Sequence, residues 1–428
     1  MTHPIVEFLR NAQPAYHPGW GGPEYTSWQD EQMSWKTTCY VGDWSFLWDL
    51  EVSGPDALKV FRDTGVNSVE NFAIGQAKHL VQCNTIGKVV AEGVVMRMAE
   101  DRFRTQSSTA FWTAFNLERG NYDARWREIK TFQLQVSGPK ALAVCEKVTG
   151  ESLRDIKFMH FRRVAIAGCE AYAVRQGMAG EIGFEFHGAQ ADKAAVLAAI
   201  LAAGEEFGIR RLGRRTAMIN HLEAAFPTGL WHYLANAFTP DTEGYREFIE
   251  THFDTSGIAP TLHGSFQSED IHEYTFSPFE LGWAKCVKFD HEFVGRAALE
   301  RELAEDNYRR RVTLEYNSDD IVKIYASLFG QDEPYEYIDI PHPQRWGAWT
   351  DAVLQNDRPM GIASMPGYSY FFRRMLALAF VDKRVAQPGS QVQVLWGEPG
   401  KRQILIRATV APAPYKRDNR RSELNSVA

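Results

Sequence analysis

The sequence has no excess of basic residues and no apolar run long enough to cross a membrane. Its 428 residues include 47 Lys and Arg against 54 Asp and Glu, a net charge of −7. Without a basic field, nucleic acid and anionic membrane surfaces are excluded as main partners. The longest apolar run, Ala194 to Ala203, is half the length of a membrane span. These features predict a soluble protein.

Disulfide and secretion signals are also missing. The five cysteines are an odd number at wide spacings without a CxxC pair, which predicts buried thiols and neither a disulfide framework nor a zinc site. The first residues, MTHPIVEFLRNAQ, contain no secretory apolar region. We therefore expect a cytoplasmic location.

Common catalytic signatures are absent as well. There is no GxSxG, HExxH, Walker loop or GxGxxG after a strand. His252, His263 and His272 are close in sequence, but their spacings fit no compact metal site on one helix. We expect no metal ion.

Aromatic residues, in contrast, are abundant. They make up 13% of the chain and include 12 Trp. Because a buried Trp N–H needs a partner, this number favours a pocket or interface that stacks flat ligands, although a generous core is the alternative. The chain length indicates two or three domains.

An internal repeat organises the first half of the chain. Leu50 to Phe61 reads LEVSGPDALKVF and Leu134 to Cys145 reads LQVSGPKALAVC, with eight of twelve positions identical. Each copy predicts a strand, a Ser-Gly-Pro turn and a helix, with Pro55 and Pro139 at the first helical position. An apolar hairpin follows each copy, at 78–96 and at 163–186. Two pseudo-equivalent α+β modules are therefore expected, with a ligand cleft at their seam.

The rest of the chain changes character. The patterns predict helices at 192–207, capped by Gly208, and at 295–305. From Arg310, short β runs separated by turns predict an all-β barrel, followed from Lys416 by a frayed basic tail. The expected division is a first module at 1–130, a second module at 131–306, a barrel at 307–415 and a tail at 416–428.

Two acidic positions stand out in the modules. In RQGMAGEIGFEFH, Arg175 to His187, glycines interrupt an apolar strand, as they do where a ligand approaches the backbone. Glu181 and Glu185 would share one face of that strand, where a carboxylate could grip the N–H and NH2 edge of a pterin. Glu92 lies in an apolar hairpin and could manage a proton or hold a cationic intermediate. Solvated carboxylates are the alternative in each case, and Asp43, between aromatics, is similar.

Several motifs together resemble a known family. They are the SGP repeat, GMAGEIGFEFHG, LGRR with NHLEAAFP, ELGWAKCVKFDHEFVGRAAL and the closing VAPAPY. In this order they resemble the tetrahydrofolate-dependent one-carbon transferases built like the glycine-cleavage T-protein. FLRNAQ, KIYASLF, GYSY and VLWGEP are similar to its vanillate and syringate O-demethylases.

The resemblance implies a clover-leaf of two α+β modules and a barrel around a central hole that admits tetrahydrofolate. It implies that Glu185 grips the pterin, that Glu92 is the acid at the end of the central hairpin, and that Phe226 packs near the folate.

The substrate side departs from the family pattern. The arginine that holds the aromatic carboxylate falls at Ser108, a pocket histidine at Phe46 and a tyrosine at Ala217. A further tyrosine falls near Tyr16 or His17. Losing the arginine removes a contact of about 1.5–3 kcal/mol, so we expect an uncharged or larger methoxy substrate.

The resemblance therefore implies an O-demethylase that moves a methyl group from a methoxylated aromatic compound to N5 of tetrahydrofolate. Tyr16, His17 and His221 are the candidate proton donors to the leaving oxygen. The alternative is aminomethyl or formaldehyde-level transfer, which gives 5,10-methylenetetrahydrofolate and would use Glu92 to steady a cation. A folate-binding protein without activity is disfavoured, because only the fragment CYVG of that branch's signature is present. We expect a monomer or homodimer.

Overall fold

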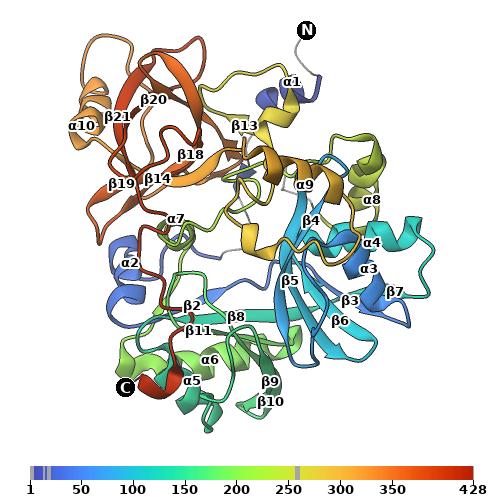
Figure 1. Ribbon diagram of the computed structural model, residues 1–428. Helices are drawn as coiled ribbons and strands as arrows, with labels where there is room; N and C mark the ends of the chain where they lie inside the picture. The colour runs from blue at the N-terminus through green and yellow to red at the C-terminus, as the bar shows by residue number, and fades with distance from the viewer. Residues whose placement is uncertain (1–3, 13–14, 17–20, 256–260, 428) are drawn as a thin grey trace.

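Three lobes surround the centre of the molecule (Figure 1). The computed structural model describes residues 4–12, 15–16, 21–255 and 261–427. Two lobes combine helices with largely antiparallel sheets, and the third, drawn in orange and red in Figure 1, is a closed β-barrel. The predicted α+β class with a C-terminal barrel is confirmed.

The first module is built on a five-stranded sheet in the order β4-β5-β6-β3-β7. Its strands are β3 (Asp49–Ser53), β4 (Ala77–Cys83), β5 (Val89–Ala99), β6 (Arg102–Gln106) and β7 (Arg125–Ile129). Helices α3 (Ala57–Thr64) and α4 (Ser108–Arg119) pack against it and bury a common apolar core. The hairpin expected at 78–96 is formed by β4 and β5.

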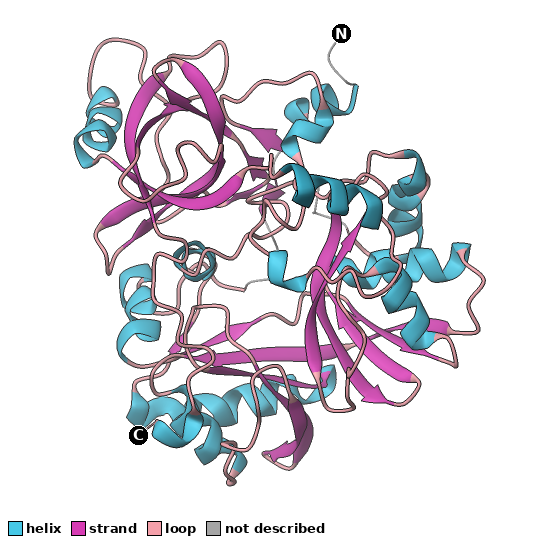
Figure 2. Cartoon of the chain, in the orientation of Figure 1, coloured by secondary structure: helices cyan, strands magenta, loops and turns pink. Residues whose placement is uncertain are grey.

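The second module is built on a six-stranded sheet in the order β12-β2-β8-β11-β10-β9. Its strands are β2 (Tyr40–Asp43), β8 (Thr131–Ser137), β9 (Phe161–Ile166), β10 (Cys169–Arg175), β11 (Gly183–Ala189) and β12 (Arg210–Arg211). Helices α5 (Ala141–Thr149) and α6 (Lys193–Gly204) lie along its outer side in Figure 2. Strand β2 precedes the first sheet in the chain, yet it pairs antiparallel with β8.

The internal repeat forms the same structure twice, as β3-turn-α3 and β8-turn-α5. Gly54 and Gly138 adopt nearly equal φ values of +134° and +138°, and a Cβ at either would lie 2.6 Å from a backbone oxygen. The turn uses the two residues after each glycine, so the helices begin two residues beyond Pro55 and Pro139. The prediction that these prolines occupy the first helical position is therefore wrong.

The segment after the second module returns to the first. It contains α7 (Ala217–Glu223), α8 (Tyr245–His252), β13 (Leu262–His263) and α9 (Arg296–Glu305), with short 3-10 turns between them. A 3-10 turn extends α6 to Phe207, and Gly208 caps it in the left-handed conformation, as predicted. The helix predicted at 295–305 is α9.

The C-terminal barrel closes in the order β14-β19-β18-β17-β20-β21. Its strands are β14 (Arg310–Tyr316), β17 (Asp351–Gln355), β18 (Arg358–Ser369), β19 (Arg374–Val381), β20 (Gln391–Trp396) and β21 (Ile404–Ala411). The sequence predicted all of these except β17. Helix α10 (Ser318–Ser327) and the short strand β16 (Ala348–Trp349), which pairs with β13, lie outside the closed order.

Both ends of the described chain are held by other elements. Helix α1 (Pro4–Asn11) buries Val6 and Leu9, strand β1 (Ala15–Tyr16) pairs with β15 (Arg345–Trp346), and α2 (Trp28–Thr37) packs beside β2.

At the C-terminal end, Leu424 is buried in the core of the second module. The guanidinium of Arg154 donates to the carbonyl oxygens of Leu424 and Val427. The expectation of a frayed tail is wrong, because a buried apolar side chain and the buried ion pair of Lys416 with Glu181 dock it.

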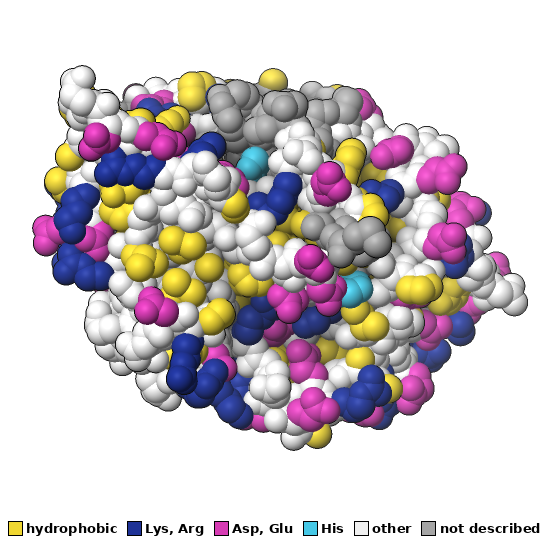
Figure 3. Space-filling model, turned by 90° about the horizontal axis from the view of Figure 1, so that it is seen from above, with side chains coloured by type: hydrophobic (Ala, Val, Ile, Leu, Met, Phe, Trp, Pro, Cys, Tyr) yellow, Lys and Arg dark blue, Asp and Glu magenta, His cyan; other side chains and the backbone are white. Residues whose placement is uncertain are grey.

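The surface shows mixed charge. On the face drawn in Figure 3, acidic and basic side chains alternate with apolar ones. Within the described ranges, no helix combines the length and apolarity that a membrane crossing requires. All five cysteines are free, with Cys39, Cys83 and Cys145 buried and Cys169 and Cys286 partly exposed.

Candidate functional site

A cavity of about 570 Å³ lies where the two modules meet the segment around α7 and α8. Aromatic side chains from distant parts of the chain form much of its wall: Trp44, Phe46, Trp48, Phe111, Phe226, Tyr233, Phe238 and Tyr245. The seam between the modules is therefore hollow and aromatic, as the repeat and the Trp content predicted.

Six of the residues singled out from the sequence line this cavity. They are Phe46, Glu92, Ser108, Glu185, His221 and Phe226. The fold brings them together from both sheets and from the segment after α7, although up to 180 positions separate them in the chain. Their common location supports one ligand site.

Two of the predicted site acids, Asp43 and Glu181, form ion pairs and do not line the cavity. The Asp43 carboxylate lies 2.5 Å from Lys193 Nζ and accepts a hydrogen bond from the backbone of Ser45. Glu181 is paired with Lys416 and accepts from Asn419 Nδ2 at 3.0 Å. Strand β11 begins only at Gly183, after the turn at Gly180, so Glu181 and Glu185 do not share a strand face. That prediction is wrong because the glycines end the regular alternation before the strand starts.

Of the three further candidates, only Ala217 has a described side chain, and it is not among the residues that line the cavity. Ala217 is buried in an apolar cluster with Trp35 and Tyr40. Tyr16 is described only by its backbone, which pairs with Arg345, and His17 lies outside the described residues.

Glu185 is one of the residues that line the cavity. Its side chain is buried on β11, and Gln135 Nε2 donates to Oε2 at 3.3 Å. Oε1 lies 2.7 Å from His187 Nε2, but the two groups are not aligned for a hydrogen bond. Among the described residues Oε1 has no hydrogen-bond donor, so it can accept one from a ligand.

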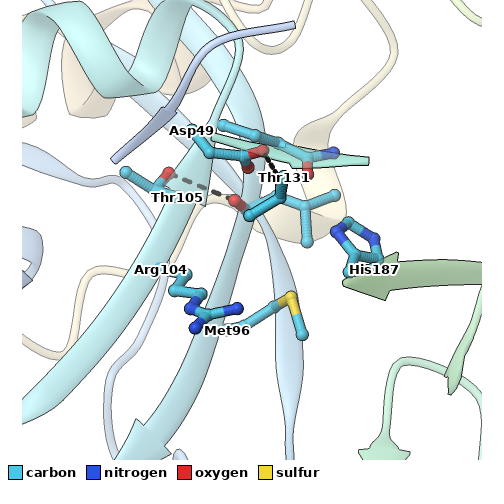
Figure 4. A pocket seen from close by; sticks show the side chains of 8 residues that line it. Asp49, Met96, Arg104, Thr105, Thr131 and His187 are labelled. Atoms are coloured by element: carbon cyan, nitrogen blue, oxygen red, sulfur yellow. Dashed lines mark hydrogen bonds between the residues drawn. The ribbon is translucent and has the colours of Figure 1, made fainter. Parts of the chain in front are cut away.

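A buried polar cluster lies behind Glu185. Figure 4 shows Asp49, Arg104, Thr131 and His187 around a small pocket between the two sheets. Asp49 accepts hydrogen bonds from Thr131 Oγ1 and Gln133 Nε2, and burial raises its pKa. Polar partners thus surround the imidazole that contacts Glu185.

Glu92 is paired with His79, a residue that the sequence reasoning missed. Val81 opposes Glu92 across the β4-β5 hairpin, which places His79 diagonally on the same face. His79 Nε2 lies 2.9 Å from Glu92 Oε2. Burial opposes the charged imidazole, but hydrogen bonds with Cys286 and Glu92 outweigh it and raise the pKa of His79 to about 10. A polar residue in an apolar hairpin, diagonal to Glu92 on the same face, was the available signal.

Ser108 has a structural role at the start of α4. Its Oγ donates to the carbonyl oxygen of Glu92 and accepts from the Glu92 N–H, both at 3.0 Å. The hydroxyl therefore fixes the backbone of the cavity acid.

His221 lines the cavity as a neutral imidazole. Its ring stacks on Trp44 at 5.4 Å, and Nδ1 lies 2.8 Å from Thr228 Oγ1. Burial lowers the pKa of His221 to about 3, so the imidazole is uncharged at neutral pH. Nε2 has no hydrogen-bond partner among the described residues. No group of three potential ligands in the described chain is placed to hold a metal ion.

Comparisons with known proteins agree with this architecture. Residues 5–252 match the GCVT N-terminal domain family. The structure resembles the glycine cleavage system aminomethyltransferase T from Bartonella henselae, with a TM-score of 0.67 over 98% of this chain and 99% of that chain. At 17% identity, this likeness establishes the fold alone.

Curated relatives cover nearly the whole chain. A syringate O-demethylase from Sphingobium sp. is 32% identical, over 96% of this chain and 93% of its own length. A sesamin methylene transferase from Sinomonas sp. is 34% identical, over 92% of this chain and 89% of its own. An aminomethyltransferase from Caldanaerobacter subterraneus is 23% identical, over 95% and 94%.

Proposed function

The chain belongs to the GCVT N-terminal domain family, and from this premise we propose that it is a tetrahydrofolate-dependent O-demethylase. It moves the methyl group of a methoxylated aromatic compound to N5 of tetrahydrofolate and releases a phenol. The observation that carries the proposal is an aromatic-walled cavity whose lining includes the acids Glu92 and Glu185. Such a cavity can hold a flat cofactor and a flat substrate edge to edge.

The residues present fit the pterin ring of tetrahydrofolate. Glu185 Oε1 is a buried acceptor without a hydrogen-bond donor among the described residues, and Oε2 has one donor at 3.3 Å. A carboxylate in this state can accept the adjacent N–H and NH2 of a pterin as two charge-assisted hydrogen bonds. Phe226, which lines the cavity beside His79 and Trp283, provides apolar surface for the ring.

Tetrahydrofolate supplies N5 as the nucleophile that accepts the one-carbon unit. The chain's own contribution is to hold the two reactants close together and to exclude water between them. Glu92 faces the cavity as a carboxylate paired with protonated His79 and is the group placed to accept a proton there.

The leaving oxygen of an aryl ether needs a proton, and two cavity groups can provide a hydrogen bond. Tyr233 lines the cavity, and burial raises the pKa of its phenol well above the usual range. The hydroxyl therefore keeps its proton at neutral pH. His221, one helical turn after Ala217 on α7, offers Nε2. We assign Tyr233 as the proton donor and His221 as the group that orients the ether oxygen.

The charges of the wall select against a benzoate. Ser108, at the family's arginine position, has its hydroxyl committed to the Glu92 backbone. An aromatic carboxylate would then meet Glu92, Glu185 and Glu250, and like charges repel in a partly dry cavity. The cations on the same wall are Arg246, whose side chain is exposed, and His79, which is paired with Glu92. The substrate is therefore an uncharged methoxylated aromatic compound.

A second candidate is transfer of a methylene unit, giving 5,10-methylenetetrahydrofolate. It is favoured by the relative named sesamin methylene transferase and by the presence of a carboxylate, Glu92, in the cavity. Both candidates need the same folate site and differ in the oxidation level of the transferred carbon.

One experiment tests the proposal and separates the candidates. The protein is incubated anaerobically with tetrahydrofolate and a panel of uncharged methoxyaromatics, methylenedioxyaromatics and benzoates, and the folate products are identified by mass. We expect 5-methyltetrahydrofolate with uncharged methoxyaromatics. Only 5,10-methylenetetrahydrofolate, with methylenedioxy compounds, would establish the second candidate. No folate product across the panel would contradict both.

A further inference from the structure

A thiol, an imidazole and a carboxylate lie in a row beside the cavity. Cys286, at the end of the 3-10 turn Ala284–Cys286, has its Sγ 3.8 Å from His79 Nδ1. The other ring nitrogen of His79 lies 2.9 Å from Glu92 Oε2. This order of groups is the one that activates a cysteine, because the acid orients and charges the imidazole, which then stabilises the thiolate.

The surroundings hold His79 in this bridging position. Trp283 meets its ring edge-on at 4.9 Å, and Phe226 packs at 5.5 Å. Packed against these two rings, the imidazole has one nitrogen toward the thiol and the other toward Glu92. Cys286 itself is partly exposed, so a small reagent can reach it.

The polar and charged groups around Cys286 also favour its thiolate form. Burial raises the pKa of Cys286, but the hydrogen bond and positive charge of His79 outweigh it, and Asn67 and Lys288 add to the effect, so the pKa is lowered. Glu92 acts on the thiol only through His79. Cys169 is the opposite case, because burial and Asp192 raise its pKa.

We propose that Cys286 is a reactive thiolate and a site of covalent modification by soft electrophiles, activated by the His79–Glu92 pair. The sulfur attacks the carbon of an alkylating agent, a carbon–sulfur bond forms, and the halide leaves with its electron pair. The proton remains on His79 throughout. The inference concerns the protein itself and does not depend on which one-carbon reaction it catalyses.

Alkylation by iodoacetamide tests the proposal with an internal control. The wild-type protein is labelled briefly at pH 6.5 and at pH 8.0, and the labelled peptides of Cys286 and Cys169 are quantified by mass spectrometry. The ratio of the two rates at one cysteine cancels differences in accessibility. For an ordinary thiol the ratio is about thirtyfold, because the thiolate fraction grows tenfold per pH unit below the pKa. We expect about that ratio at Cys169 and a clearly smaller one at Cys286. Equal ratios, or no label at Cys286 where Cys169 reacts, would overturn the proposal.

A variant assigns the effect to His79. His79→Gln keeps a polar side chain but cannot carry a charge, so the ratio at Cys286 should rise to that of Cys169, and an unchanged low ratio would contradict the role of His79. If the variant does not fold, as judged by circular dichroism, the thiolate is measured by its ultraviolet absorbance instead. The difference between wild type and Cys286→Ser should then appear below the pH at which ordinary thiols ionise. A difference that appears only at the ordinary pH would refute the inference.

Discussion

Replacing Glu185 by Gln gives the most direct test of the folate site. The change keeps the shape of the side chain but removes its charge, and it places an amide NH2 where the carboxylate would accept hydrogen bonds. A hydrogen bond to a charged group contributes about 1.5–3 kcal/mol, so the dissociation constant should rise about 10- to 150-fold. The side chain is buried and has few other partners to compensate.

The assay is calorimetric titration with 5-methyltetrahydrofolate, which avoids turnover. Glu181→Gln is the matched control, because Glu181 lies four residues away and is paired with Lys416 and not with the cavity. Its affinity should stay within about twofold of wild type. If Glu185→Gln binds as tightly as wild type, or if both variants lose affinity equally, the assignment of the pterin contact is refuted. Thermal melts confirm that both variants are folded at the titration temperature.

Three further outcomes follow from the site. Ser108→Arg restores a cation beside Glu92 and should lower KM for a methoxybenzoate about tenfold or more, while Ser108→Ala should not. Tyr233→Phe should lower kcat at least about 100-fold with little change in KM if the phenol donates the proton, and unchanged turnover would exclude that role. Because the pKa of His79 is raised to about 10 in the folded state, its stabilisation is complete below the unfolded pKa and is lost as pH rises through 10. The difference in free energy of unfolding between wild type and His79→Gln should therefore shrink from pH 6.5 to pH 10 in urea titrations.

Much of the fold could be predicted from local sequence patterns. The repeat predicted the two strand-turn-helix units, and alternation predicted most of the barrel, because both depend on neighbours in the sequence. Strand β2 was not recognisable as part of the second sheet, since its pairing with β8 joins residues nearly a hundred positions apart. The docking of the C-terminal tail was missed for the same reason. Its anchoring residues, Leu424 and the partly buried Val427, are isolated apolar side chains in a polar segment.

The candidate site was predicted unevenly. Glu92 and Glu185 were found because an acid in an apolar strand is conspicuous, and the cavity contains both. Glu181 was misplaced because glycines break the alternation on which the face argument depended. The role of His79 could be recognised only from the register of the β4-β5 hairpin. Its contact with Cys286 could be recognised only from the tertiary structure, since the two residues are more than 200 positions apart.

The exchange of strand β2 has a consequence for how the molecule can be divided. A fragment that ended at residue 130 would contain β2 but not β8, the strand with which β2 pairs in the antiparallel direction. That edge of β2 would then be unpaired and exposed. During synthesis this strand must wait until the next hundred residues have left the ribosome before it can pair. The two repeated modules are similar in structure, but the second cannot be separated by cutting the chain at residue 130, because its sheet takes β2 from the N-terminal part.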